Sequence, residues 1–160
     1  MTTTDPTSTA LAAPTTAHNA TEAQLRHERD ARGVHTLTLN TPAAFNVLSE
    51  SMLADLQAAL ASVAADPQAR AVVLAAEGKA FCAGHNLKEM RARPEQAYYQ
   101  ALFAQCTRVM LAIQALPVPV IARVQGLATA AGCQLVAQCD LAVAVDTARF
   151  GVNGIDVGLF

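Results

Sequence analysis

The stretch from Gly126 to Asp140 joins a run of small residues to an apolar helical pattern, and its composition suits binding of a polarised oxygen. Small side chains let another group approach the backbone, and the first N–H groups of a helix have no acceptor within it. These groups also lie at the positive end of the helix dipole, which favours an anion. We therefore predict half of a site that polarises a carbonyl oxygen. The alternative is that these small residues only let a helix pack tightly on a sheet.

The elements that must position this stretch alternate between strands and helices. Strand patterns cover residues 34–39, 71–76, 118–124 and 139–145, and a further extended piece is expected from Phe150. The strands at 71–76 and 139–145 are expected to be buried. A loop with two glycines fills 77–87. One helix is predicted after Leu48, capped by Ser49 or Ser51, and a long helix over 94–116. This alternation predicts an α/β fold with mostly parallel pairing.

Apolar residues at helical spacing mark the faces that these two helices bury. The expected inward residues are Met52, Leu53, Leu56, Leu60 and Val63 in the first helix, and Tyr98, Leu102, Val109 and Ile113 in the second.

Composition and charge exclude several classes of protein. The 160 residues are 52% hydrophobic, which suits one globular domain. The net charge is −2 and no basic stripe occurs, so we expect no nucleic-acid partner. Arg123 and Gln125 interrupt the most apolar run, so we expect no membrane span. The four cysteines form no CxxC pair and the four histidines complete no ligand pattern, so we expect reduced thiols and no metal site.

The two ends of the chain differ in composition from its middle. Residues 1–24 are rich in Thr, Ala and Pro and lack the features of a signal or transit peptide, so we predict a disordered tail on a cytoplasmic protein. Residues 25–160 form the predicted domain. Its last residues, Val157–Phe160, are apolar and have no polar tail, whereas domain boundaries normally fall in exposed polar sequence. We therefore expect a C-terminally truncated domain.

Two segments, 80–90 and 117–140, closely resemble the signature stretches of the crotonase superfamily, the enoyl-CoA hydratase/isomerase group. They read Ala-Phe-Cys-Ala-Gly-His-Asn-Leu-Lys-Glu-Met and Pro-Val-Pro-Val-Ile-Ala-Arg-Val-Gln-Gly-Leu-Ala-Thr-Ala-Ala-Gly-Cys-Gln-Leu-Val-Ala-Gln-Cys-Asp. Their order and separation also match, and the resemblance covers roughly residues 25 to 160. The form Ala-Ala-Gly-Cys-Gln is most similar to one branch of that superfamily.

The resemblance implies a spiral of ββα units that binds an acyl-CoA or enoyl-CoA thioester. Coenzyme A enters as part of the substrate and no cofactor is bound permanently. Family members hold the thioester carbonyl with two backbone N–H groups, and the matching positions here are Ala83 and Ala131. A homotrimer or hexamer in fatty acid metabolism is expected for a full-length form. The segment that matches the binding site for the adenine end of CoA comprises Ala83, Gly84, His85, Asn86 and Leu87, with Lys88 facing a phosphate or only solvent.

The sequence departs from the family pattern at the two catalytic glutamates. Gln134 and Gly154 stand at the matching positions, and neither side chain can exchange a proton near neutral pH. We therefore predict weak hydration of enoyl-CoA. Gln134 could still orient a water or a substrate group, or simply face solvent. Asp156 could replace the second glutamate if a strand placed residues 154 and 156 on one face, while Asp140 is expected to be a structural hydrogen-bond acceptor.

Three alternatives to an enolate-forming enzyme stay open at this point. Cys82 or Cys133, with His85 as base, would form an acyl-transfer site, although small buried cysteines are generally inert. The chain could also be a non-catalytic acyl-CoA-binding or regulatory module, or a truncated inactive remnant with exposed apolar faces. A serine peptidase on the related fold is excluded because no serine follows Ser62.

Overall fold

The computed structural model describes Met1 and residues 23–158, in which eight strands form two sheets. The larger sheet has the order β1-β2-β3-β5-β7, and the smaller sheet has the order β4-β6-β8. Only the pairing of β1 with β2 is antiparallel. The bounds are β1 Leu25–Arg29, β2 Val34–Leu39, β3 Ala71–Ala76, β4 Ala80–Cys82, β5 Val120–Val124, β6 Leu127–Thr129, β7 Leu141–Ala144 and β8 Arg149–Gly151.

The two sheets are built together from a repeated unit of two strands and a helix. Strands β3, β5 and β7 of the larger sheet are each followed by a short strand of the smaller sheet, namely β4, β6 and β8. A helical segment then completes each unit: α2 (Leu87–Ala92) with α3 (Gln96–Gln114), α4 (Ala131–Ala137), and the 3₁₀ turn η2 (Gly154–Val157). The predicted α/β spiral of ββα units is confirmed.

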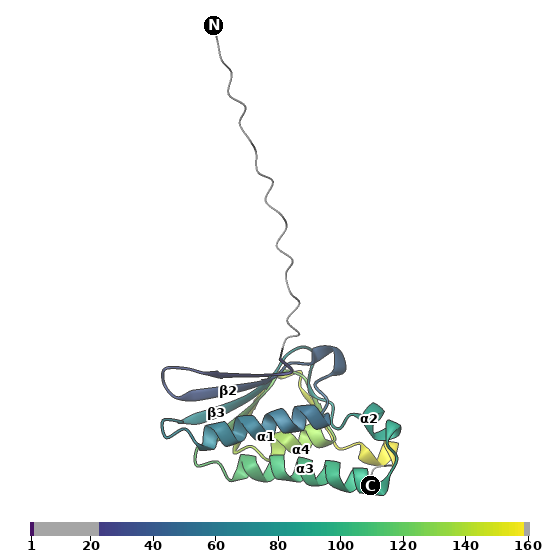
Figure 1. Cartoon of the computed structure of the whole chain (residues 1–160). Helices are drawn as coiled ribbons and strands as arrows, with labels where there is room; N and C mark the ends of the chain where they lie inside the picture. Colours follow the sequence, from purple (N-terminus) through teal and green to yellow (C-terminus); the bar gives the residue numbers. More distant parts are fainter. Residues whose placement is uncertain (2–22, 159–160) are drawn as a thin grey trace.

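Helix α1 (Glu50–Ala64) follows the short 3₁₀ turn η1 (Pro42–Ala44) and begins where the sequence predicts. Ser49 is its N-cap, because its hydroxyl accepts a hydrogen bond from the N–H of Met52 at 3.0 Å. Glu50 lies in the first turn, where its negative charge interacts favourably with the positive end of the helix dipole. Helices α1, α3 and α4 lie on one side of β2 and β3, with α1 packed against α3 (Figure 1).

The core lies between these helices and the larger sheet. All five inward residues predicted for the first helix are buried, as are Leu102, Val109 and Ile113 of α3. Tyr98 is only half-buried. Strand β3 has no exposed residue, as its continuous apolar sequence predicts.

Several short elements differ from the predictions. Strand β4 lies within the segment 77–87 that was expected to be a loop, and helix α2 begins at the last residue of that segment. Strand β1 was not expected because its sequence is mostly polar. Strand β7 was predicted to be buried, but all its residues are exposed, because in the described part of the chain it packs substantially against β5 alone and no helix covers its faces. The carboxylate of Asp140 accepts a hydrogen bond from the N–H of Val120 at 2.7 Å, which confirms its structural role.

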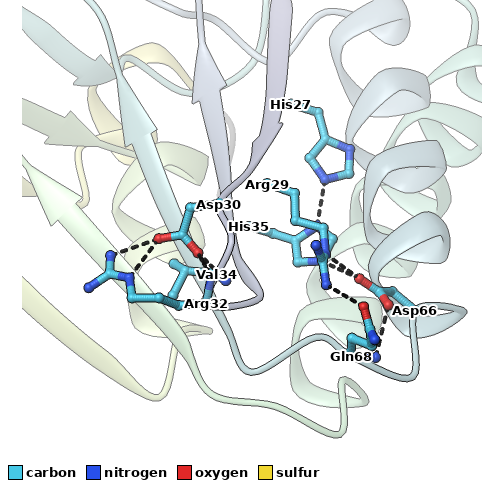
Figure 2. A network of polar contacts seen from close by, with 8 residues as sticks. All are labelled: His27, Arg29, Asp30, Arg32, Val34, His35, Asp66 and Gln68. Atoms are coloured by element: carbon cyan, nitrogen blue, oxygen red, sulfur yellow. Dashed lines mark hydrogen bonds and ion pairs between the residues drawn. The ribbon is translucent and has the colours of Figure 1, made fainter.

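A polar network links β1 and β2 to the turn after α1 (Figure 2). His27 Nε2 lies 2.8 Å from His35 Nδ1, and His35 Nε2 lies 3.0 Å from the carboxylate of Asp66. Arg29 Nε donates to that carboxylate at 2.8 Å and its guanidinium also donates to Gln68. This network ties the antiparallel edge strand to the body of the domain.

The predicted tail falls almost entirely on residues 2–22, which lie outside the described part of the chain. Within the described part, no helix has both the length and the hydropathy needed to cross a bilayer.

Candidate functional site

A cavity of about 600 Å³ lies at the carboxyl ends of the three parallel strands of the smaller sheet. Its walls are the segments that directly follow these strands, together with α3 and α4. Because the carboxyl ends of neighbouring parallel strands meet at one edge, these three distant segments lie side by side. The lining residues are Ala83, His85 and Leu87; Thr129, Ala130 and Ala131; Val152, Asn153 and Gly154; Phe103, Cys106 and Thr107; and Cys133, Gln134 and Ala137.

The loop after β4 and the start of α4 touch each other at two glycines. A Cβ atom on Gly132 would lie 2.1 Å from the carbonyl oxygen of Cys82, so no larger residue fits there. Gly84 has a φ of +89°, and a Cβ atom on it would lie 3.3 Å from the backbone nitrogen of Ala131. The two segments that resemble the signature stretches of the superfamily are therefore packed backbone against backbone.

Helix α4 begins at Ala131, and its entry is strained. Ala130 precedes it with φ 51° and ψ −127°, a conformation that residues with a Cβ rarely adopt. The N–H of Ala130 donates to the carbonyl oxygen of Gly151 at 2.8 Å, which fixes this turn against the end of β8. The N–H of Ala131 has no acceptor among the described residues, as the predicted role requires.

The N–H of Ala83 is engaged within the fold. It donates to the carbonyl oxygen of Phe45 at 3.1 Å, and the next N–H, of Gly84, donates to the sulfur of Cys82. This contact speaks against the assignment of Ala83 as a donor to a ligand. The sequence did not reveal it because Phe45 belongs to the distant turn after η1.

His85 carries the next N–H along this loop, and its backbone turns the other way. Leu48 pairs with it as an isolated parallel bridge, in which the N–H of Leu48 donates to Gly84 at 2.8 Å and Asn86 donates to Leu48 at 3.4 Å. In such a bridge the amide of the central residue points away from the partner strand. The N–H of His85 accordingly has no acceptor among the described residues.

The imidazole of His85 also lines the cavity. Its ring packs edge-on against Phe103 with centroids 5.3 Å apart, and its Nδ1 atom is buried without a hydrogen-bond partner within residues 23–158. Burial lowers the pKa of His85 below its usual value. The backbone of Leu48 has a smaller and opposite effect on this pKa.

The residues at the two glutamate positions face the same cavity, whereas the substitute acid does not. Gln134 and Gly154 are both in the lining. Asp156 is exposed and outside it, because the chain from Gly154 forms a 3₁₀ turn where a strand was expected. Residues 154 and 156 therefore do not share the face that the strand hypothesis required, and the prediction for Asp156 is wrong on this point.

The residues matched to the adenine end of CoA have different roles in the fold. Asn86 caps α2, since its side-chain oxygen accepts hydrogen bonds from the N–H groups of Lys88 and Glu89. Lys88 is exposed at the start of that helix. Only Ala83, His85 and Leu87 of the matched segment reach the cavity lining.

The buried thiols are poor nucleophiles. Burial raises the pKa of Cys82 to about 12, so its thiol stays protonated at neutral pH. Cys133 lies in the cavity lining, and its reactivity stays a prediction. No cluster of three or more His, Cys, Asp or Glu side chains suited to a metal ion is found in the described residues.

Known proteins share this sequence over most of its length. The family described as Enoyl-CoA hydratase/isomerase matches residues 29–160. The enoyl-CoA hydratase domain-containing protein 3 of Xenopus laevis is 49% identical over 128 residues, 80% of this chain and 44% of its own. That of Homo sapiens is 43% identical over 132 residues, 82% of this chain and 44% of its own. Both names include the word mitochondrial, which does not fit the cytoplasmic prediction.

Solved structures agree in sequence and in shape. An enoyl-CoA hydratase from Mycobacterium smegmatis is 69% identical with a TM-score of 0.86, covering 87% of this chain and 54% of its own. Human enoyl-CoA hydratase domain-containing protein 3 is 42% identical with a TM-score of 0.82, covering 86% and 54%. The chain spans about half the length of the relatives it matches.

Proposed function

We propose that this chain, which belongs to the enoyl-CoA hydratase/isomerase family, binds acyl-CoA thioesters and polarises their carbonyl group. Within the family it is similar to the enoyl-CoA hydratase domain-containing protein 3 branch, as the Ala-Ala-Gly-Cys-Gln form predicts. The observation that carries this proposal is a pair of backbone N–H groups that find no acceptor in the described part of the chain, on two segments that pack against each other beside a cavity. Ala131 supplies one donor. We assign the second to His85 in place of Ala83, whose N–H is engaged with Phe45.

Two donors aimed at one oxygen stabilise the negative charge that develops on it in an enolate. A single donor of this kind typically lowers the activation barrier by about 3 kcal/mol, because it acts in a site from which water is excluded. A cavity of about 600 Å³ lies within the usual size range for a small-molecule site. We propose that the acyl portion of the thioester occupies it.

The remaining features of the substrate complex also belong to this proposal. Residues 83–87 line the adenine end of CoA, Lys88 lies near a phosphate, and CoA is present only as part of the substrate. A trimer or hexamer and a role in fatty acid metabolism are proposed for a full-length form. A location in the cytoplasm stays a prediction, which fractionation of cells that produce the protein tests against the mitochondrial relatives.

Hydration of crotonyl-CoA is expected to be slow. Each missing acid or base removes about 10²–10⁴-fold in rate, and Gln134 and Gly154 supply neither. We expect saturable binding of butanoyl-CoA by calorimetry, with hydration of crotonyl-CoA at least about 10²-fold below that of a family member with both glutamates, by loss of enoyl absorbance. The variant carrying Gln134→Glu and Gly154→Glu is expected to hydrate faster than the unmodified chain.

Two results would contradict this proposal in different ways. Absence of binding to butanoyl-CoA would remove the thioester site altogether. Hydration by the unmodified chain as fast as by a glutamate-bearing relative would show that another group replaces both carboxylates.

A non-catalytic acyl-CoA-binding or regulatory module is the second candidate. The absence of a proton-exchanging side chain at Gln134 and Gly154 favours it. Both candidates bind the thioester, but only an enolate-forming enzyme exchanges the α-protons of the acyl group with D₂O.

A further inference from the structure

We propose that the imidazole of His85 is the base that removes and returns the α-proton of the bound thioester, in a cavity whose glutamate positions carry Gln134 and Gly154. This inference rests on the proposed function, because it requires an acyl thioester in that cavity. His85 then acts twice: its backbone N–H holds the oxygen, and its side chain handles the proton.

The position of His85 places both groups beside the same ligand. The bridge to Leu48 fixes the backbone of residues 84–86, and the edge-on contact with Phe103 of α3 holds the ring in the cavity wall. Ala131 approaches from the opposite segment through its contact with Gly84. A carbonyl oxygen held between the two amides therefore has its α-carbon inside the cavity that the ring lines.

No competing base lines this cavity within the described part of the chain. Its lining contains no carboxylate, no lysine and no second imidazole. The titratable groups there besides His85 are the thiols of Cys106 and Cys133. Burial raises the pKa of Cys106 to about 11, which keeps that thiol protonated near neutral pH.

The environment of the ring favours its neutral, proton-accepting form. Among the described residues, Nδ1 is buried and unpartnered, and no acidic side chain acts on the imidazole to stabilise a positive charge. The lowered pKa of His85 leaves the ring unprotonated at neutral pH. A neutral imidazole has one unprotonated ring nitrogen, and a base needs the lone pair of such a nitrogen free before the substrate arrives.

The proton transfer is balanced without any further reactant. A ring nitrogen of His85 takes the α-proton, and the electron pair of the broken C–H bond forms the C=C bond of the enolate. The negative charge moves to the thioester oxygen, which accepts hydrogen bonds from Ala131 and His85. Return of the proton to the α-carbon restores the thioester and neutral imidazole, and in D₂O the returned proton is a deuteron.

Exchange of butanoyl-CoA in D₂O, followed by mass spectrometry, tests this step in the whole chain. The unmodified protein is expected to incorporate deuterium with a rate that rises with pH and levels off above the pKa of His85. His85→Gln is expected to slow exchange by about 10²-fold or more while calorimetry gives a similar Kd. His85→Ala is expected to recover exchange when free imidazole is added. His27→Gln, which replaces a histidine outside the cavity, is expected to exchange like the unmodified chain.

The outcomes separate this inference from the proposed function. Binding of butanoyl-CoA with no exchange by the unmodified protein, or with undiminished exchange by His85→Gln, would overturn the role of His85 and leave thioester binding intact. Absence of binding would overturn the proposed function itself. If His85→Gln melts at a lower temperature, recovery of His85→Ala by imidazole still decides the matter, because a purely structural role gives no such recovery.

Discussion

Ala130 adopts a backbone conformation that glycine reaches at much lower cost. Its φ of 51° with ψ of −127° stores about 1–3 kcal/mol in a residue with a Cβ. Glycine would lose about 0.5–1 kcal/mol more chain entropy on folding. The strain is the larger of the two, so we expect Ala130→Gly to raise the free energy of unfolding by about 1 kcal/mol.

Urea denaturation of matched variants checks this expectation. Ala58→Gly provides the control, because Ala58 is exposed in the middle of α1 and glycine there is expected to cost about 1 kcal/mol. Equal destabilisation by both substitutions would show that Ala130 is unstrained.

Individual site residues were predictable in their segments but not in their exact atoms. The motifs pointed to the loop after residue 82 and to the helix start near residue 131, and both line the cavity. The free loop amide belongs to His85 and not to Ala83, because pairing with Phe45 and Leu48 is a tertiary effect that a local pattern does not contain. Asp156 was misplaced since its segment turns into a 3₁₀ helix.

At the level of elements, the polar network between β1, β2 and the end of α1 makes stability depend on pH (Figure 2). Partial burial, and then the charge of His35, lower the pKa of His27. A lowered histidine pKa means that the unfolded chain binds the proton more readily. The contribution to stability is complete above the unfolded value of about 6.5 and is lost as the pH falls through the folded pKa.

We therefore expect the melting temperature to fall between pH 7 and pH 5, and to fall less in His27→Gln. His85, whose pKa is also lowered, contributes in the same direction, so part of the slope remains. The pKa of Asp66 is lowered by several hydrogen-bond donors, of which the N–H of Gln68 has the largest effect. The contribution of Asp66 to stability is therefore lost only at more acidic pH, below about 4.

Calorimetric melts in matched buffers measure this slope. Asp146→Asn, an exposed site outside the network, serves as control and is expected to retain it. An unchanged slope in His27→Gln would assign the acid sensitivity to other groups.

Long elements were predictable and short ones were not. Helix α1 and strands β2 and β3 follow from a strong apolar period and a cap, which are local features. Strands β1 and β4 and helix α2 are short, and their formation depends on neighbours that are distant in sequence. The exposure of β7 depends on its position in the sheet, which no apolar run specifies.

Viewed as a whole, the described molecule presents apolar side chains at a free sheet edge. Leu141 and Val143 of the edge strand β7 are 61% and 64% exposed. Unpaired edge strands with apolar side chains favour association between chains.

We expect the 160-residue chain to self-associate as its concentration rises, and Leu141→Lys with Val143→Lys to suppress this association. Analytical ultracentrifugation over a concentration series measures it. Leu111→Lys, which replaces an exposed leucine on helix α3, is the control and is expected to have little effect. A chain that stays monomeric at every concentration and melts sharply would contradict the expectation.

The cavity takes one wall from each of three successive ββα units, with its last lining residue at Gly154. During synthesis the pocket therefore cannot exist until nearly all of the described chain has left the ribosome. Binding of the ligand therefore indicates that all three units have folded together. A thioester that binds only the folded pocket would shift newly made chains toward the folded state by mass action.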